Sequence, residues 1–203
     1  MQRIAIIDYG MGNVRSVQKA IEFVSPDDEV LLTHDRTYIE NSDRVVFPGQ
    51  GAIGGCMKVL DELGLTNSIK QAANEKPLLG ICLGLQMLFD WSEENGGTNG
   101  ISIFEGTVNH FQGDELKVPH MGWNTLHQTK EHKLWEGIDN DARFYSVHSY
   151  YVSPLDNDIV IGKSEYGSSF CSAVAKDNIF AVQFHPEKSQ HNGLKVLNNF
   201  VKI

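Results

Sequence analysis

Hydrophobic residues in the first 90 positions occur in two arrangements that alternate along the chain. Short continuous apolar runs, which are typical of buried strands, occupy residues 3–7, 30–32, 44–47 and 78–82. Apolar residues recur at helical spacing over residues 14–24, 55–63 and 67–74, and a further helix is expected to begin within residues 85–89. This alternation predicts a doubly wound α/β fold with a mainly parallel sheet flanked by helices.

From residue 101 the pattern changes to short β-like segments. We expect these extra strands at residues 106–111, 123–126, 143–150, 159–164, 172–175 and 179–184, before a closing helix over residues 192–201. No repeat, low-complexity tract or linker divides the chain, so residues 1–203 are expected to form a single domain. In such a sheet, ligands bind at the carboxyl ends of the strands.

Composition narrows the class of protein. Asp and Glu outnumber Lys and Arg by 26 to 17, which gives a net charge of −9 and argues against nucleic-acid binding, because phosphate contacts need clustered positive charge. The cysteines, Cys56, Cys82 and Cys171, are too few for a disulfide scaffold or a zinc site. No apolar run could cross a membrane, and the apolar run of residues 4–7 near the start is too short for the core of a signal peptide. We expect a cytoplasmic protein without metal or cofactor.

The residues around Cys82 indicate a nucleophile. Gly80 and Gly84 flank it in a Gly-x-Cys-x-Gly pattern between a predicted strand and a predicted helix. Small residues at those positions allow the sharp turn of a nucleophile elbow. A thiol there would lie near a helix N-terminus and near backbone N–H groups that can stabilise an oxyanion. A buried cysteine at a strand end is the common alternative.

His185 and Glu187 provide the groups that such a thiol would need. The thiol requires an imidazole to take its proton, and the imidazole requires an acceptor that fixes its tautomer. Both residues follow the strand predicted at 179–184, and on an extended segment two residues apart they leave the same face. Pro186 stiffens the segment between them. With Cys82 they form a Cys–His–Glu set from two strand ends.

Three segments together resemble the class I (triad-type) glutamine amidotransferases. They are residues 48–51 (Pro-Gly-Gln-Gly), 80–86 and 184–187 (Phe-His-Pro-Glu), in the family's order over essentially the whole chain. The resemblance implies hydrolysis of the glutamine side-chain amide, with Cys82 as nucleophile, His185 as acid and base, and Glu187 orienting the imidazole. It assigns the oxyanion hole to Gly49, Gln50, Gly51 and Leu83, and glutamine binding to Gln86, Gly51, His148, Ser149 and Tyr150. Many related sequences carry valine at position 50, but the role there belongs to the backbone.

Other segments resemble one branch of that family, the glutaminase subunits of imidazole glycerol phosphate synthase in histidine biosynthesis. They are residues 8–13, 120–124 and 145–150, together with Lys188. The resemblance implies a heterodimer with a (β/α)8-barrel cyclase subunit, which uses the ammonia to make imidazole glycerol phosphate and aminoimidazole carboxamide ribotide. It places Asn13, Trp123, Tyr145 and Lys188 in the interface. Activity should be low without the partner and its nucleotide substrate.

Three alternatives remain open from the sequence. The chain could serve another synthase, it could be a binding module that keeps the fold without turnover, or it could be a cysteine-elbow hydrolase of peptides or aldehydes. The intact Cys82, His185 and Glu187 oppose the binding module, and the His-Pro-Glu segment opposes the hydrolase. Asp90, Glu93 and Glu94 are expected to form a solvated helix end.

Overall fold

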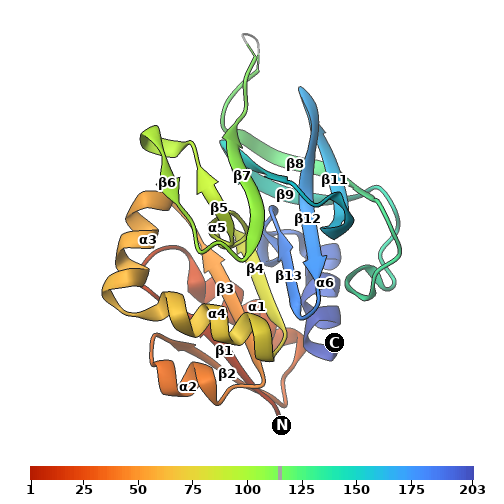
Figure 1. Ribbon diagram of the computed structural model, residues 1–203. Helices are drawn as coiled ribbons and strands as arrows, with labels where there is room; N and C mark the ends of the chain where they lie inside the picture. Colours follow the sequence, from red (N-terminus) through yellow and green to blue (C-terminus); the bar gives the residue numbers. More distant parts are fainter. Residues whose placement is uncertain (114–115) are drawn as a thin grey trace.

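A parallel sheet forms the centre of the fold in the computed structural model, which describes residues 1–113 and 116–203 (Figure 1). Its strands lie in the order β2 (Glu29–Thr33), β1 (Arg3–Ile7), β3 (Arg44–Gly49), β4 (Leu78–Cys82) and β13 (Ile179–Val182). Neighbouring strands of this set pair in parallel. The carboxyl ends of β3, β4 and β13 therefore meet at one edge.

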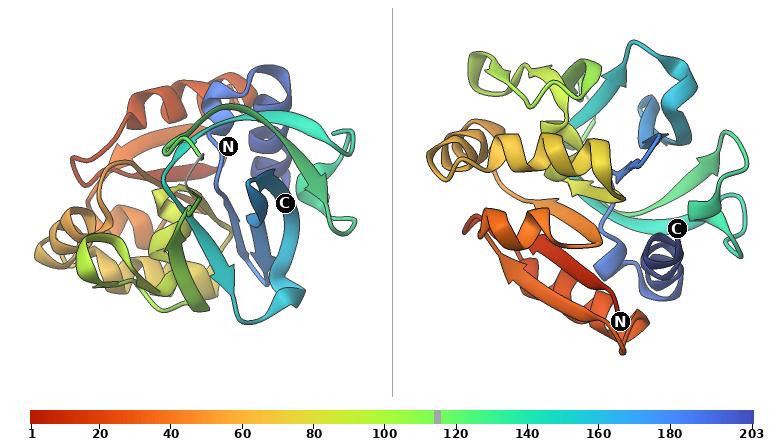
Figure 2. Two further views of the ribbon diagram at one scale, coloured as in Figure 1. Left: turned by 90° about the horizontal axis from the view of Figure 1, so that it is seen from above. Right: turned by 60° about the horizontal axis from the view of Figure 1, so that its bottom comes forward.

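Helices cover both faces of this sheet, because its strands are apolar on both sides. Alternate residues of β1 belong to two separate cores. Ile4 and Ile6 pack with α1 (Val14–Val24) and α6 (Gln190–Lys202), whereas Ala5 and Ile7 pack with α3 (Ile53–Glu62) and α4 (Leu65–Glu75). Figure 2 shows that α1 and α6, which come from opposite ends of the chain, lie side by side. The remaining helices of the first half are the short α2 (Arg36–Glu40) and α5 (Leu83–Met87).

The second half extends the sheet with mostly antiparallel strands. Beyond β13 the order continues through β12 (Ser168–Lys176), β10 (Tyr150–Pro154), β7 (Phe104–His110), β5 (Phe89–Ser92) and β6 (Thr98–Asn99). A branch from β12 contains β11 (Val160–Tyr166), β8 (His120–Gln128) and β9 (Ala142–His148), and β8 and β9 lie above β4 and β13 in Figure 1. Short 3-10 helices occupy Glu94–Gly96, Lys133–Trp135, Asn157–Ile159 and Pro186–Lys188.

The fold class predicted from the pattern is confirmed, and two predicted elements are wrong. Residues 143–150 form two strands, because β9 pairs with β8 and β10 pairs with β7. Phe89 begins β5 and is not helical, since residues 101–104 donate backbone hydrogen bonds to the carbonyls of Met87, Leu88 and Phe89 and end the helix there. None of the helices in the described residues is long and apolar enough to cross a membrane.

Candidate active site

Cys82 occupies a strained turn between β4 and α5. Its φ of 54° is a left-handed conformation, which is uncommon for a residue with a side chain and persists only where its surroundings enforce it. The neighbouring glycines explain how the turn is possible. A Cβ at Gly84 would lie 1.9 Å from the carbonyl oxygen of Phe47, and one at Gly80 would lie 3.0 Å from the Cβ of Ala181. The Gly-x-Cys-x-Gly pattern therefore has the elbow geometry expected for it.

His185 and Glu187 form a buried pair beside this turn. The Nδ1 of His185 lies 2.9 Å from Oε1 of Glu187, and their side chains are 6% and 2% exposed. Glu187 reaches the ring because Pro186 begins a 3-10 helix (Pro186–Lys188), not because the segment is extended as the sequence pattern predicts. The Nε2 of His185 is buried without a hydrogen-bond partner among the described residues, so it remains available to a ligand.

The charge of this imidazole depends on its neighbours. Burial lowers the pKa of His185, but Cys82 and then Glu187 outweigh it, so that the pKa lies well above its ordinary value. An imidazolium next to Cys82 is the proton arrangement that keeps a thiolate ready to attack. The three residues can thus supply a nucleophile, a proton donor and an orienting carboxylate.

A pocket of about 280 Å³ opens in front of Cys82. It is lined by Cys82, His185, Gln50, Gly51, Leu83, Gln86, Glu94, Pro119, Val147, His148, Ser149 and Tyr150. Among the residues that the resemblance assigns to the oxyanion hole and to glutamine, only Gly49 is missing from this lining. Gly49 faces a small space of about 10 Å³ on the other side, together with Asn13, His185 and Glu187.

The backbone segments of Gly49 and Leu83 lie against each other beside Cys82. Gly49 lies directly opposite Cys82 in the pairing of β3 with β4. Leu83 is the first residue of α5, where backbone N–H groups have no partner within the helix. A Cβ at Gly49 would lie 2.8 Å from the Cβ of Leu83, so the two segments touch. Gly51 has a φ of 101°, which favours glycine.

Hydrogen bonds link Gln86, which lines the pocket, through Gln183 to the sulfur of Cys82. The Nε2 of Gln86 donates to the Tyr150 carbonyl at 2.9 Å and to Oε1 of Gln183 at 3.1 Å, which uses both of its hydrogens. Gln183 in turn donates to Sγ of Cys82 at 3.7 Å. Gln86 therefore offers a ligand only its oxygen. Sequence reasoning missed Gln183, although an amide inside the apolar run 179–184 was a usable signal.

His148, which lines the pocket, is hydrogen-bonded to a second buried histidine, His120. The Nδ1 of His148 lies 2.8 Å from the Tyr150 carbonyl, so it must carry the proton, and Nε2 then accepts from Nδ1 of His120 at 3.0 Å. The Nε2 of His120 lies 3.2 Å from Nδ2 of Asn124. Burial is the main cause that lowers the pKa of both, that of His148 to about 3. The sequence assigns His148 to glutamine binding but gives His120 no role.

Glu94 does not belong to a solvated helix end. It begins a 3-10 helix and its Oε2 accepts a hydrogen bond from the backbone N–H of Ile53 at 2.8 Å. Its side chain lines the pocket. The sequence prediction was wrong because Asp90 lies in strand β5, so the residues that follow fold back onto α3. Glu94 thus places a carboxylate next to the site.

Three of the four residues assigned to an interface lie together. Trp123 and Tyr145 face each other across β8 and β9, with ring centroids 6.2 Å apart. Lys188 Nζ lies 6.0 Å from the centre of the Tyr145 ring. Asn13 is the exposed residue before α1 and lines the small space behind Gly49. Trp123, Tyr145 and Lys188 therefore form one cluster.

Comparisons with known proteins agree on one family. The glutamine amidotransferase class-I family matches residues 5–203. Imidazole glycerol phosphate synthase subunit HisH of Nitrosospira multiformis is 55% identical over 100% of this chain and 98% of its own, and that of Acinetobacter baylyi is 50% identical over 100% and 98%.

Solved structures show the same fold at lower identity. Thermotoga maritima PurLQS has a TM-score of 0.77 at 18% identity, covering 100% of this chain and 99% of its own. A glutamine amidotransferase from the same organism has a TM-score of 0.65 at 18% identity, with 92% of this chain and 76% of its own covered.

Proposed function

Because the chain belongs to the class-I glutamine amidotransferases and to the family of imidazole glycerol phosphate synthase subunit HisH, we propose that it is the glutaminase subunit of that synthase. It hydrolyses glutamine to glutamate and ammonia, and the ammonia serves a cyclase subunit in histidine biosynthesis. The observation that carries the proposal is the left-handed turn at Cys82 beside the buried His185–Glu187 pair.

Cys82 acts as the nucleophile in the first half of the reaction. Its sulfur attacks the side-chain amide carbon of glutamine, and the carbonyl oxygen becomes an oxyanion that backbone N–H groups of Leu83 and the 49–51 segment stabilise. When the tetrahedral intermediate collapses, the carbon–nitrogen bond breaks and His185 gives its Nε2 proton to the departing ammonia. The product is a thioester between Cys82 and the glutamyl group.

Water completes the cycle. His185, now neutral, takes a proton from a water molecule that attacks the thioester. The carbon–sulfur bond then breaks, which releases glutamate and restores the Cys82 thiolate beside the imidazolium. Glu187 holds Nδ1 throughout, which keeps Nε2 directed at the reacting atoms. Each step uses only groups that line the pocket or support its lining.

Polar groups on the pocket wall suit the other end of glutamine. Glu94 can pair with the α-ammonium group, and the oxygen of Gln86 is free to accept from it as well. The residues 148–150 form the facing wall, where Ser149 and the backbone offer hydrogen bonds to the α-carboxylate. We therefore keep Gln86, Gly51, His148, Ser149 and Tyr150 as proposed glutamine-binding residues and add Glu94.

The partner is a (β/α)8-barrel cyclase of the HisF type, which binds over the cluster of Trp123, Tyr145 and Lys188 and beside Asn13. Aromatic residues are favoured anchors of interfaces, and a lysine over an aromatic ring adds cation–π attraction. Free ammonia mostly becomes ammonium in water and loses its nucleophilicity, so transfer within a heterodimer keeps it in the reactive neutral form. The free thiols of all three cysteines suit the reducing cytoplasm.

Glutamate release tests the activity. The purified chain is assayed with glutamine, alone and with the cyclase subunit of the same organism plus its phosphoribulosyl ribonucleotide substrate, beside Cys82→Ala. We expect strong stimulation by the pair and a loss of about 10⁴-fold or more in the variant. Full activity of the chain alone would contradict the coupled-subunit proposal, and absence of release in every condition would favour a binding module.

Two tryptophans with equal exposure test the interface. Trp123 and Trp91 are each 39% exposed, but only Trp123 belongs to the proposed interface cluster. Trp123→Ala should weaken binding of the cyclase by about 2 kcal/mol, as expected for a central aromatic anchor, whereas Trp91→Ala should not. Titration calorimetry measures both, and equal effects of the two variants would exclude this surface.

A further inference from the structure

Two buried side chains outside the Cys–His–Glu set donate hydrogen bonds to the backbone of the 48–51 segment. The hydroxyl of Tyr9 donates to the carbonyl of Pro48 at 3.1 Å. The thiol of Cys56 donates to the carbonyl of Gln50 at 3.6 Å, a normal distance for sulfur. These two carbonyls belong to the peptide units on either side of the Gly49–Gln50 peptide.

Both side chains also pack in the hydrophobic core on the α3 and α4 side of the sheet. Tyr9 follows β1 and Cys56 lies in α3, so two separate elements of the fold contact the segment. Their exposed fractions are 3% and 0%, and neither lines the pocket in front of Cys82. Burial raises the pKa of both groups, the phenol strongly, so each keeps the proton that it donates.

The contacts leave the segment little room to move. A Cβ at Gly49 would lie 3.0 Å from the hydroxyl oxygen of Tyr9, so the backbone rests directly on that group. From the other side, a Cβ at Gly12 would lie 3.3 Å from the Cβ of Gln50. The segment is thus enclosed by the β1–α1 loop, by α3 and by the elbow itself.

We propose that Tyr9 and Cys56 are positioning residues for the oxyanion hole, holding the peptide units of residues 48–51 at a fixed distance from Cys82. The N–H of Gly49 belongs to the peptide unit whose carbonyl Tyr9 binds, and the N–H of Gly51 belongs to the unit that Cys56 binds. The N–H of Gln50 belongs to the Gly49–Gln50 peptide unit between these two. This inference rests on the proposed glutaminase activity.

The consequence is a selective effect on the transition state. Oxyanion-hole donors act on charge that develops only after the sulfur has attacked, so misplacing them lowers kcat and leaves substrate binding unchanged. Attack by Cys82 on an alkylating agent forms no oxyanion and needs no such donor. Loss of either hydrogen bond should therefore slow glutamine hydrolysis but not alkylation of Cys82.

The experiment uses the complex with the cyclase partner and its ribonucleotide substrate. Tyr9→Phe and Cys56→Ala should each lower kcat for glutamate release by roughly threefold to tenfold, the contribution of one neutral hydrogen bond. KM for glutamine and the rate of Cys82 alkylation by iodoacetamide, followed by peptide mass spectrometry, should stay near wild type, and the melting temperature should fall by only a few degrees, as expected for one lost hydrogen bond. Cys56→Ser keeps a donor and should retain more activity than Cys56→Ala.

Cys171→Ala is the matched control, since Cys171 is also a buried thiol that donates to a backbone carbonyl, that of Ala173, but it lies in β12. If Tyr9→Phe and Cys56→Ala match Cys171→Ala in kcat, the positioning role is wrong. If they lower alkylation and melting temperature in parallel with kcat, the residues stabilise only the fold and the inference is also wrong. A wild-type complex that releases no glutamate would overturn the proposed function and this inference with it.

Discussion

Two regions at one pocket each bury histidine, and they shift its pKa in opposite directions. At the end of β13, His185 contacts Glu187 and lies beside Cys82, and these neighbours raise its pKa. On β8 and β9, His120 and His148 contact each other, a carbonyl and an amide, and burial lowers the pKa of both.

Burial alone does not decide what a histidine does. Burial removes water from the imidazole in both regions and so disfavours its charge. Only His185 has negative partners that offset this cost, which makes it able to give and take a proton. The pair of His120 and His148 has neutral partners around it, among them the rings of Phe111 and Phe170, and serves as a fixed wall.

Removing the carboxylate should make the first region resemble the second. In Glu187→Gln the amide can still accept from Nδ1 of His185, but it no longer stabilises an imidazolium. We expect kcat of the activated complex to fall by about 10²- to 10⁴-fold, with the imidazole pKa in the pH–rate profile moving downwards. Steady-state kinetics across pH measures both effects.

Glu62→Gln is the control for that substitution, because Glu62 is an exposed carboxylate paired with Lys58 at 3.8 Å. It should leave kcat unchanged. Wild-type activity in Glu187→Gln would mean that Cys82 alone sustains the charge of His185.

More of the first region than of the second could be predicted from the sequence. The turn at Cys82 could be predicted because its requirement is local: two glycines, a strand before it and a helix after it. The proximity of His185 to Cys82 could be predicted because both follow strands, and the carboxyl ends of parallel strands meet.

The second region could not be predicted, because its contacts depend on antiparallel register. His120 meets His148 because β8 and β9 pair in one particular alignment, and a shift of one strand by one residue would place the two side chains on opposite faces. Gln183 is an intermediate case, because its amide in an apolar run was a usable signal but its partner Gln86, far away in the sequence, could not be predicted. Glu94 was misjudged because the end of α5 is set by residues 101–104, which lie beyond any local pattern.

Removing His148 should damage the second region mainly through stability. His148→Ala leaves the Nδ1 proton of His120 without its acceptor and opens a space beside Phe111 and Phe170. We expect a loss of about 2–4 kcal/mol in the free energy of unfolding, from an unpaired buried group together with a cavity. Urea denaturation followed by circular dichroism measures it, and a loss below about 1 kcal/mol would show that this wall is not a structural element.

The same region should make the protein sensitive to acid. Folded His148 has a pKa of about 3, below the value of about 6.5 expected in the unfolded chain, so only the unfolded state binds a proton between these pH values. Its contribution is fully present above pH ~6.5 and decreases as pH falls, by roughly 1 kcal/mol per pH unit. His185, with a raised pKa, contributes in the opposite direction as pH rises. Urea titrations between pH ~6.5 and ~5 should give a shallower dependence in His148→Gln than in wild type, and equal slopes would exclude this cause.

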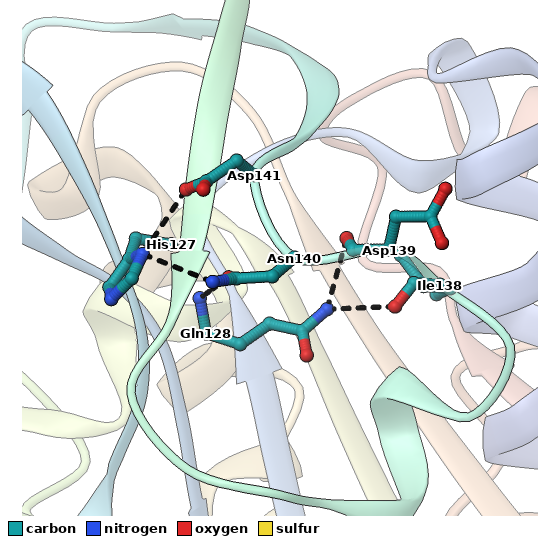
Figure 3. Close-up of polar contacts among 6 residues, drawn as sticks. All are labelled: His127, Gln128, Ile138, Asp139, Asn140 and Asp141. Carbon is teal, nitrogen blue, oxygen red and sulfur yellow. Dashed lines mark hydrogen bonds and ion pairs between the residues drawn. The ribbon is translucent and has the colours of Figure 1, made fainter.

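The smallest effect is expected at His127, an exposed histidine of β8, the strand that pairs with β9. His127 of β8 lies 3.1 Å from Asp141 and 3.4 Å from Asn140, and the side chains of His127 and Asp141 are 62% and 58% exposed (Figure 3). Water already solvates both groups, so the pair gains little from meeting. Asn140 accepts from the N–H of Gln128 at 2.7 Å without help from His127.

His127→Ala should therefore change the free energy of unfolding by no more than about 0.5 kcal/mol and leave glutamate release unaltered. Urea denaturation of this variant beside His148→Ala compares two histidines of one β-ribbon that differ mainly in burial. A loss equal to that of His148→Ala would mean that the number of hydrogen bonds, and not the removal of water around them, determines what each histidine contributes.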